Sequence, residues 1–240
     1  ALNNGMIQPF VPFAVRGAIW YQGESNENEP DRYRGFLPLL IADWREDFER
    51  PDMPFGIVQL AAYRAFEAER PVSGIWPAMR EAQSETAAVV PGVGIVVLTD
   101  IGDAADIHPR NKREVGRRLA GWALHDHYDR PVVDHASPRV SECRRIPRSA
   151  GQPADRIRLT VVDSAGGLRT RDGAGPDGFA VQGPSGRWHW ADAVIDSDGT
   201  SITVWSDRVP DPVAVAYAWQ DNPERANVTG ATGLPLDQFR

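Results

Sequence analysis

Cysteine is almost absent from the sequence, since Cys143 is the only one among 240 residues. A single thiol can form no internal disulfide and cannot build a cysteine-rich zinc site. No apolar run approaches the roughly 20 residues that a membrane-spanning helix needs, and the first ten residues lack the basic start and apolar stretch of a signal peptide. We therefore expect no membrane partner. Because the chain begins with Ala1 instead of methionine, we also expect a processed or excised piece of a longer protein.

Positive charge is scarce as well. Lys and Arg number 26 against 33 Asp and Glu, which gives a net charge of −7. Basic residues do not cluster with aromatic ones into a face that could neutralise phosphates, so we exclude nucleic acid as a partner. With 42% hydrophobic and 25% charged residues, the chain should fold in water as one large domain or two small ones.

The first half of the chain has the pattern of a parallel α/β sheet. Largely apolar runs at residues 17–21, 55–60 and 94–99 are typical of strands buried on both faces. Apolar residues at helical spacing predict a helix over residues 33–48, with Pro38 at its first turn or at a kink. They predict a second helix from Pro77 toward Ala88 and a third through Val115, Leu119 and Trp122.

After about Tyr128 the composition changes, because Gly, Pro, Asp and Ser increase and the apolar segments become short and alternating. This pattern is typical of antiparallel strands. The predicted strands lie at residues 157–162, 179–181, 188–194, 202–205 and 213–219. We therefore predict an α/β portion at residues 1–132 and a smaller β-sandwich-like domain at residues 133–240.

The loop after the third predicted strand has the composition of a catalytic site. The carboxyl ends of parallel strands line the ligand crevice, and this loop brings Asp100, Asp103, Asp106 and His108 into one short stretch. A carboxylate beside a histidine can fix its tautomer and stabilise the imidazolium formed during acyl transfer, so we predict His108 as a general base. The alternative is that the aspartates close turns and His108 is a surface residue. A metal site would need a second histidine at a ligand spacing, so we predict no metal and no cofactor.

The loop after the first predicted strand is the second candidate. Gly23 allows a tight turn there, and Gln22 and Asn26 could direct donors toward an oxyanion. Ser25 could act as the nucleophile, because Glu24-Ser25-Asn26 partly resembles a nucleophile elbow, although the second glycine of that elbow is missing. The alternative is that Ser25 and Asn26 cap the following helix and Glu24 forms a buried hydrogen bond or salt bridge.

These loops belong to a series of motifs that closely resemble the sialate O-acetylesterase family. In the first half the motifs are Gly17-Ala-Ile-Trp-Tyr-Gln-Gly-Glu-Ser-Asn26, Tyr33-Arg34, Asp43-Trp44-Arg45, Pro54-Phe55, Val58-Gln59-Leu60, Arg80-Glu-Ala-Gln83, Asp100-Ile-Gly-Asp103 and Ile107-His108-Pro109. In the second half they are Ala216-Tyr-Ala-Trp219, Asn222-Pro223, Asn227 and Gly233-Leu-Pro235. The resemblance therefore covers nearly the whole chain.

The resemblance implies an SGNH-type hydrolase, in which a flavodoxin-like parallel sheet has helices on both faces and precedes the smaller antiparallel β domain. It implies an O-acetylesterase that removes acetyl groups from sugars with a serine nucleophile, with His108 as the base and without a metal. The residues from Gln22 to Asn26 would form the acetyl and oxyanion pocket, and Arg80 and Gln83 would be polar groups of the active site. An acetylated sugar would be the substrate, and the family suggests a periplasmic or secreted location.

The sequence departs from the family pattern at two points. The family's nucleophile lies in a Gly-Gln-Ser-Asn-type motif on an early strand, and no such motif occurs here, since the motif containing Ser25 is a later one. The aspartate that such enzymes often place three residues before the catalytic histidine is replaced by Ala105. Asp103 or Asp106 must then orient His108, and Asp103 matches the family better.

Two interpretations of function follow. The chain is an esterase, completed by Ser25 or by a segment absent from it, or it is a non-catalytic fragment or carbohydrate-binding module. In the second case Trp188, Trp190 and Trp219 could contact sugar, although tryptophans at strand positions usually pack inward. A missing first strand would leave an unpaired sheet edge, which predicts a homodimer or a missing N-terminal segment.

Overall fold

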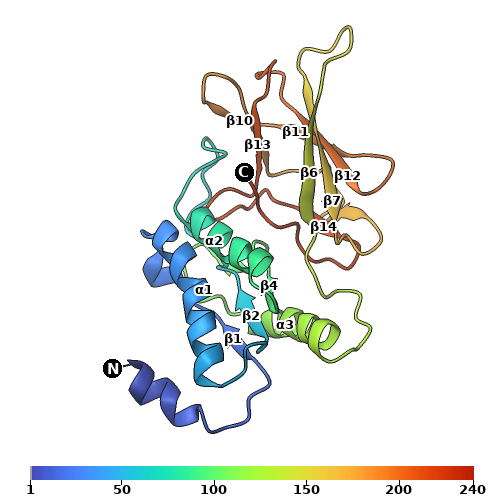
Figure 1. The fold of residues 1–240 in the computed structure, drawn as a ribbon. Coiled ribbons are helices and arrows are strands. Elements are labelled where there is room, and N and C mark those ends of the chain that lie inside the picture. The colour runs from blue at the N-terminus through green and yellow to red at the C-terminus, as the bar shows by residue number, and fades with distance from the viewer. Residues whose placement is uncertain (1) are drawn as a thin grey trace.

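A three-stranded parallel sheet lies at the centre of the α/β half of the molecule. The computed structural model describes residues 2–240, and its α/β half comprises residues 2–127 (Figure 1). The strands are β1 (Ala18–Trp20), β2 (Phe55–Val58) and β4 (Val93–Val96), in the order β1-β2-β4. Parallel pairing aligns Ala18 with Phe55 and Phe55 with Val93. The predicted parallel sheet is therefore confirmed.

Three helices cover the two faces of this sheet, as the apolar periodicity predicted. They are α1 (Pro30–Asp47), α2 (Trp76–Val89) and α3 (Lys112–His127). Phe55 and Ile57 of β2 share a core cluster with residues of α1 and α2, whereas Val58 packs in a second cluster with Val115 of α3. Because side chains alternate along a strand, α1 and α2 lie on one face and α3 on the other.

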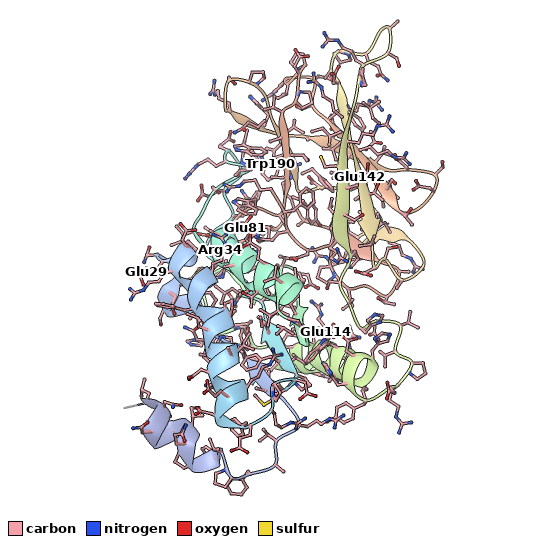
Figure 2. The ribbon with its side chains drawn as sticks, viewed as in Figure 1. Glu29, Arg34, Glu81, Glu114, Glu142 and Trp190 are labelled. Atoms are coloured by element: carbon pink, nitrogen blue, oxygen red, sulfur yellow. The ribbon has the colours of Figure 1, made fainter. Side chains whose placement is uncertain are left out.

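The helix ends follow from local sequence. Pro30 and Pro77 stand in the first turns of α1 and α2, where a missing N–H costs no hydrogen bond. Asn111 caps α3 by accepting a hydrogen bond from the Glu114 N–H at 3.3 Å. Pro38 lies in the interior of α1, so of its two expected places the first turn is excluded. Arg34 of α1 lies beside Glu81 of α2, with 3.0 Å between Nη2 and Oε2 (Figure 2).

Antiparallel sheets make up the β half, residues 139–240. One sheet has the order β11-β12-β7-β6 and another β10-β9-β13, and β14 pairs with β8. The strands are β6 (Arg139–Ile146), β7 (Arg156–Val162), β8 (Leu168–Thr170), β9 (Phe179–Gln182), β10 (Trp188–Trp190), β11 (Asp192–Ile195), β12 (Ser201–Trp205), β13 (Ala214–Tyr217) and β14 (Val228–Gly230). Their apolar side chains form one core, in which Leu159, Phe179 and Ile202 are fully buried.

The β half differs from the sequence prediction in several details, and the short strands β8 and β14 were among those not predicted. The run at residues 188–194 was expected as one strand, but it divides into β10 and β11, which belong to different sheets. Strand β6 was not predicted, because five of its eight residues are polar or charged and most of the strand is exposed to solvent. Its place at a sheet edge explains this polar composition.

Four short segments also belong to the α/β half. A π-helical turn (Asn3–Ile7) and a 3-10 turn (Gln8–Phe10) precede β1, and the two-residue strands β3 (Ala62–Tyr63) and β5 (Gly102–Asp103) pair in parallel. Within residues 2–240, none of the helices combines the length and apolar character that crossing a bilayer requires.

Candidate active site

The loop at residues 22–26 follows β1 and turns sharply at Gly23, whose φ is 154°. This conformation suits glycine, and a Cβ there would also press on the side chains of Leu60 and Gln83. The next three residues form a 3-10 turn (Glu24–Asn26) in which the Asn26 N–H donates to the Gly23 carbonyl at 2.9 Å. The side chains of Gln22 and Asn26 contact each other, with 2.8 Å between Nε2 and Oδ1. The two amides therefore lie together, and the Gln22 Nε2 donates to Asn26.

Two side chains hold this loop from inside the α/β half. The Gln22 carbonyl accepts hydrogen bonds from the Tyr33 hydroxyl and from the Gln83 Nε2, both at 3.0 Å. Gln83 is fully buried, and its Oε1 accepts a hydrogen bond from the Leu60 N–H at 2.9 Å. Burial raises the pKa of Tyr33, so its hydroxyl stays protonated and donates. Gln83 thus acts on the loop through the backbone of Gln22.

Arg80 lies on the neighbouring turn of α2 and is completely buried. Its Nη2 donates to the carbonyl oxygens of Gln220, at 2.5 Å, and of Asp221, at 3.0 Å. Burial lowers its pKa to about 10, although the charges of Asp221 and Asp237 oppose this change. The guanidinium is enclosed against the β half, so contact with a substrate would require residues 220 and 221 to move away.

The His108 loop, residues 99–109, follows β4. Asp103 Oδ1 accepts a hydrogen bond from the Ala105 N–H, and Asp106 Oδ1 accepts one from the His108 N–H, both at 2.9 Å. These bonds close turns, as one of the two sequence interpretations expected. Asp106 Oδ1 also lies 3.5 Å from Nδ1 of the His108 ring, whose side chain is 87% exposed. The Asp106 pKa is lowered first by the His108 backbone N–H and then by charge on the His108 ring and Arg110.

The two loops lie at the same edge of the sheet. Lys112 Nζ, just beyond the His108 loop, lies 4.5 Å from the centroid of the Tyr21 ring, which directly precedes the 22–26 loop. Ile107 packs against the core cluster that also contains Tyr33 and Trp20. The tertiary structure therefore places the two predicted loops at the same edge of the sheet.

The serines occupy other positions. Ser25 lies in the exposed 3-10 turn, and no serine among residues 2–240 shares a hydrogen bond with the His108 ring. Ser84 of α2 donates instead to Asp237 Oδ2 at 2.8 Å and accepts from Gln59 Nε2 at 3.1 Å. Burial raises the pKa of Asp237, while its hydrogen bonds to Gln59 and Ser84 lower it by a smaller amount. Sequence reasoning missed this cluster, because its three members are separated by long stretches of chain and have no shared motif.

Two clefts border these residues. The larger one has a volume of about 660 Å³ and lies along the edge of β4, between α2, Trp122 of α3 and the C-terminal residues 237–240. The smaller one, about 400 Å³, lies at the strand ends. Residues 99–104 of the His108 loop and Ala62 form one wall of the smaller cleft, and Arg171 and residues 222–224 of the β half form the other. In the part of the chain that the structure describes, no group of three or more His, Cys, Asp or Glu side chains is placed to hold a metal ion.

Of the three tryptophans considered as sugar contacts, Trp219 and Trp190 contact other parts of the fold. Trp219 is buried, and the Arg240 guanidinium lies 4.5 Å from its ring centroid. Trp190 donates from Nε1 to the Ala68 carbonyl at 2.6 Å, so it faces the loop that precedes α2 (Figure 2). Trp188 is half-buried in β10.

Similarity to known proteins identifies the family of this chain. The family model described as carbohydrate esterase, sialic acid-specific acetylesterase, matches residues 4–125. The chain belongs to this family. The resemblance inferred from the motifs is thereby confirmed, and the matched residues include both loops of the candidate site.

Individual members of the sialic acid-specific acetylesterase family are similar over different lengths. Sialate O-acetylesterases of Homo sapiens and Mus musculus are 35% and 33% identical over 135 residues, which cover 49% of this chain and 25% and 24% of those proteins. The crystal structure of a carbohydrate acetylesterase from Xanthomonas citri superposes with a TM-score of 0.86 at 38% identity. That match covers 98% of this chain and 52% of the solved one, so the chain spans about half the length of that relative and about a quarter of the curated ones.

Proposed function

We propose that the chain takes part in hydrolysing acetyl esters of carbohydrates by a serine–histidine mechanism, with His108 as the general base. Membership of a carbohydrate esterase family supports the reaction class. The observation that carries the residue assignment is the His108 ring, whose Nδ1 lies 3.5 Å from Asp106 Oδ1 and whose side chain is 87% exposed to solvent.

In this mechanism the exposed Nε2 of His108 takes the proton from a serine hydroxyl as the serine oxygen attacks the acetyl carbonyl carbon. The imidazolium then returns the proton to the departing sugar oxygen, and an acetyl-serine remains. A water molecule, deprotonated by the same ring, releases acetate. Asp106 stabilises the imidazolium, with Asp103 as the alternative, because a carboxylate facing Nδ1 favours the charged ring. Donors of the 22–26 loop, from Gly23 and Asn26, would stabilise the oxyanion.

The nucleophile has two candidates. Ser25 is the one within this chain, and it would have to approach His108 by a change in the 3-10 turn that contains it. The other is a serine supplied by a segment outside the chain. For the substrate we propose an acetylated, sialate-type sugar, seated in the cleft of about 400 Å³ at the strand ends. Its hydroxyl groups would face Arg171 and Asn222.

Hydrolysis of p-nitrophenyl acetate tests this proposal. The variants are Ser25→Ala and His108→Ala, with His189→Ala in the β half as a matched control for the loss of an imidazole. We expect His108→Ala to lose at least a hundredfold in kcat, within the range that general base catalysis supplies, and His189→Ala to be unchanged. Labelling by a serine-directed phosphonate, followed by mass spectrometry of the peptides, identifies the nucleophile. Equal activity of the unaltered chain and His108→Ala would rule out this assignment of the base.

The second candidate function is that of a non-catalytic part of such an esterase. It is favoured by one observation, the absence of a serine bonded to the His108 ring among the residues described. Under this alternative the chain shows neither turnover nor phosphonate labelling, although acetylated sialic acid still protects the 99–104 segment from hydrogen exchange. An active chain whose label maps to Ser25 would exclude it.

A further inference from the structure

Arg64 joins the candidate oxyanion loop to the β half. Its Nη2 lies 2.7 Å from Oε2 of Glu27, the residue that ends the 3-10 turn containing Ser25 and Asn26. Its Nη1 lies 3.0 Å from Oδ2 of Asp221, which follows β13 in the β half. One side chain therefore bridges two carboxylates that are far apart in the sequence and belong to different halves of the molecule.

Asp221 is held firmly at the other end of this bridge. Its side chain is only 12% exposed, and its Oδ1 accepts a hydrogen bond from the Trp76 N–H, the first residue of α2, at 2.8 Å. A carboxylate is favourable at this helix end, because the first N–H groups of a helix have no partner within it. A Cβ on Gly74 would overlap the Asp221 carboxylate, so glycine at this position allows the close approach.

The backbone around the bridge is also joined across the two halves. The Asp221 carbonyl accepts hydrogen bonds from the Tyr63 N–H at 3.2 Å and from Arg80, and the amide of Asn222 donates to the Arg64 carbonyl at 2.9 Å. Arg64 has a φ of 78°, a left-handed conformation that non-glycine residues adopt only when their surroundings hold them there. The contacts with residues 221 and 222 supply that constraint.

We propose that Arg64 and Asp221 are positioning residues, through which the β half sets the conformation of the 22–26 loop. Gln22 is held by Tyr33 and Gln83 at one end of the loop, and Glu27 is held by Arg64 just beyond the other end. Without the Asp221 carboxylate, Arg64 would keep only Glu27 as an ionic partner, and the Arg64 side chain would no longer be fixed to the β half. The 3-10 turn would then lose the contact that holds its C-terminal end. The β half thereby acts on the site without contributing the reacting groups.

Hydrogen exchange of the complete chain tests the coupling without requiring turnover. We compare Asp221→Asn, Glu27→Gln and their double variant, and follow the amides of residues 24–29. Each single variant should exchange about 5-fold faster there, at the lower end of measured couplings between sites. Because both changes break the same bridge, the double variant should exchange no faster than the faster single variant. Arg64→Lys should lie between these and the unaltered chain, since a lysine can keep only one partner at a time.

Arg158 offers a matched control. It also bridges two carboxylates, Asp196 at 2.8 Å and Asp198 at 2.6 Å, with a similar exposure, but wholly within the β half. Arg158→Lys should leave exchange of residues 24–29 unchanged. Hydrogen exchange of the α3 amides reports whether each variant is folded. If Asp221→Asn does not fold, Asn222→Ser frees the Arg64 carbonyl while the carboxylate remains, and it should speed the same amides about 2-fold.

Kinetic measurements provide the second test. The catalytic role of the coupling rests on the proposed function, and the kinetics distinguish a failure of the proposed function from a failure of the coupling. In an active chain, Asp221→Asn should lower kcat and leave KM within 2-fold, because the loop acts in the transition state. A chain without turnover contradicts the proposed self-sufficient enzyme but leaves the exchange result valid. The coupling is overturned if Glu27→Gln accelerates exchange of residues 24–29 and Asp221→Asn does not, or if their effects add.

Discussion

The guanidinium of Arg118 faces the carboxylate of Asp100 in a two-point contact, with 2.8 Å between Nη1 and Oδ1 and 2.7 Å between Nη2 and Oδ2. Arg118 is 4% exposed and also donates to the Val97 carbonyl at 2.5 Å and to Glu114 at 2.9 Å. Asp100 stands just past β4, at the start of the His108 loop. Helix α3 therefore anchors the beginning of that loop, and Asp100 is engaged in this ion pair.

Replacing Arg118 by Met should destabilise the fold by about 3–5 kcal/mol, because the Asp100 carboxylate, only 13% exposed, would lose its partner. The free energy of unfolding in urea measures this loss. Arg117→Met is the control on the same helix, since Arg117 pairs with Glu114 and Asp134 at a more exposed position. It should cost about 1 kcal/mol or less. Equal losses in the two variants would contradict the anchoring role of Arg118.

Stability should fall in acid partly through Glu114. Its hydrogen bond from Arg117 is the main cause that lowers its pKa from 4.5 to about 2, and Arg118 adds to the effect. A carboxyl group with a lower pKa in the folded state stabilises the protein above its unfolded pKa and loses this contribution as the pH falls through the folded value. Glu114→Gln should cost about 1–2 kcal/mol at pH 7. The deficit should shrink between pH 4.5 and about pH 2, as urea titrations at several pH values would show; a constant deficit would exclude this cause.

Gly102 opens strand β5 with a φ of 155°, and a Cβ on it would overlap the carbonyl oxygen of Ala62. Gly102→Ala should therefore cost about 2 kcal/mol, by strain and by disturbing the pairing of β3 with β5. Gly116 of α3 has no neighbour near the position of a Cβ, so Gly116→Ala should gain up to about 1 kcal/mol. Thermal melts should show shifts of opposite sign. An unchanged melting temperature in Gly102→Ala would mean that the pairing of β3 with β5 tolerates a methyl group.

The edge of β1 should support self-association. Among the described residues β1 pairs only with β2, Ile19 is 65% exposed, and an apolar hollow of about 260 Å³ lined by Phe10, Val15 and Trp44 adjoins the strand. We predict a dimer through this edge. Light scattering of the unaltered chain and of Ile19→Lys measures it, with Val213→Lys, also at an exposed apolar position, as the control. A monomer at all concentrations would contradict the prediction, and so would a dimer unaffected by Ile19→Lys.

The order of strands and helices in the α/β half could be predicted from the sequence, because each element has its own periodicity. The runs around Phe55 and Ile95 are apolar on both faces, and the helical stripe through Tyr33, Leu37 and Ile41 is buried in α1 as its spacing indicates. The same local information placed Gln22 and His108 at strand ends. In the β half, prediction from local sequence failed where burial depends on distant parts of the chain. Strand β6 is polar because it lies at a sheet edge, and residues 188–194 divide between two sheets.

The sequence by itself determined the class of the fold, the family and the two loops, since these depend on residues close together in the chain. Only the tertiary structure decided which groups meet. Folding buries both Arg80 and Gln83, and it encloses Arg80 against residues 220 and 221. Arg64 contacts Asp221, which is 157 positions away in the sequence, because folding brings the two residues together. Contacts of this kind arise from the packing of complete elements, and no short segment of the sequence contains the information that specifies them.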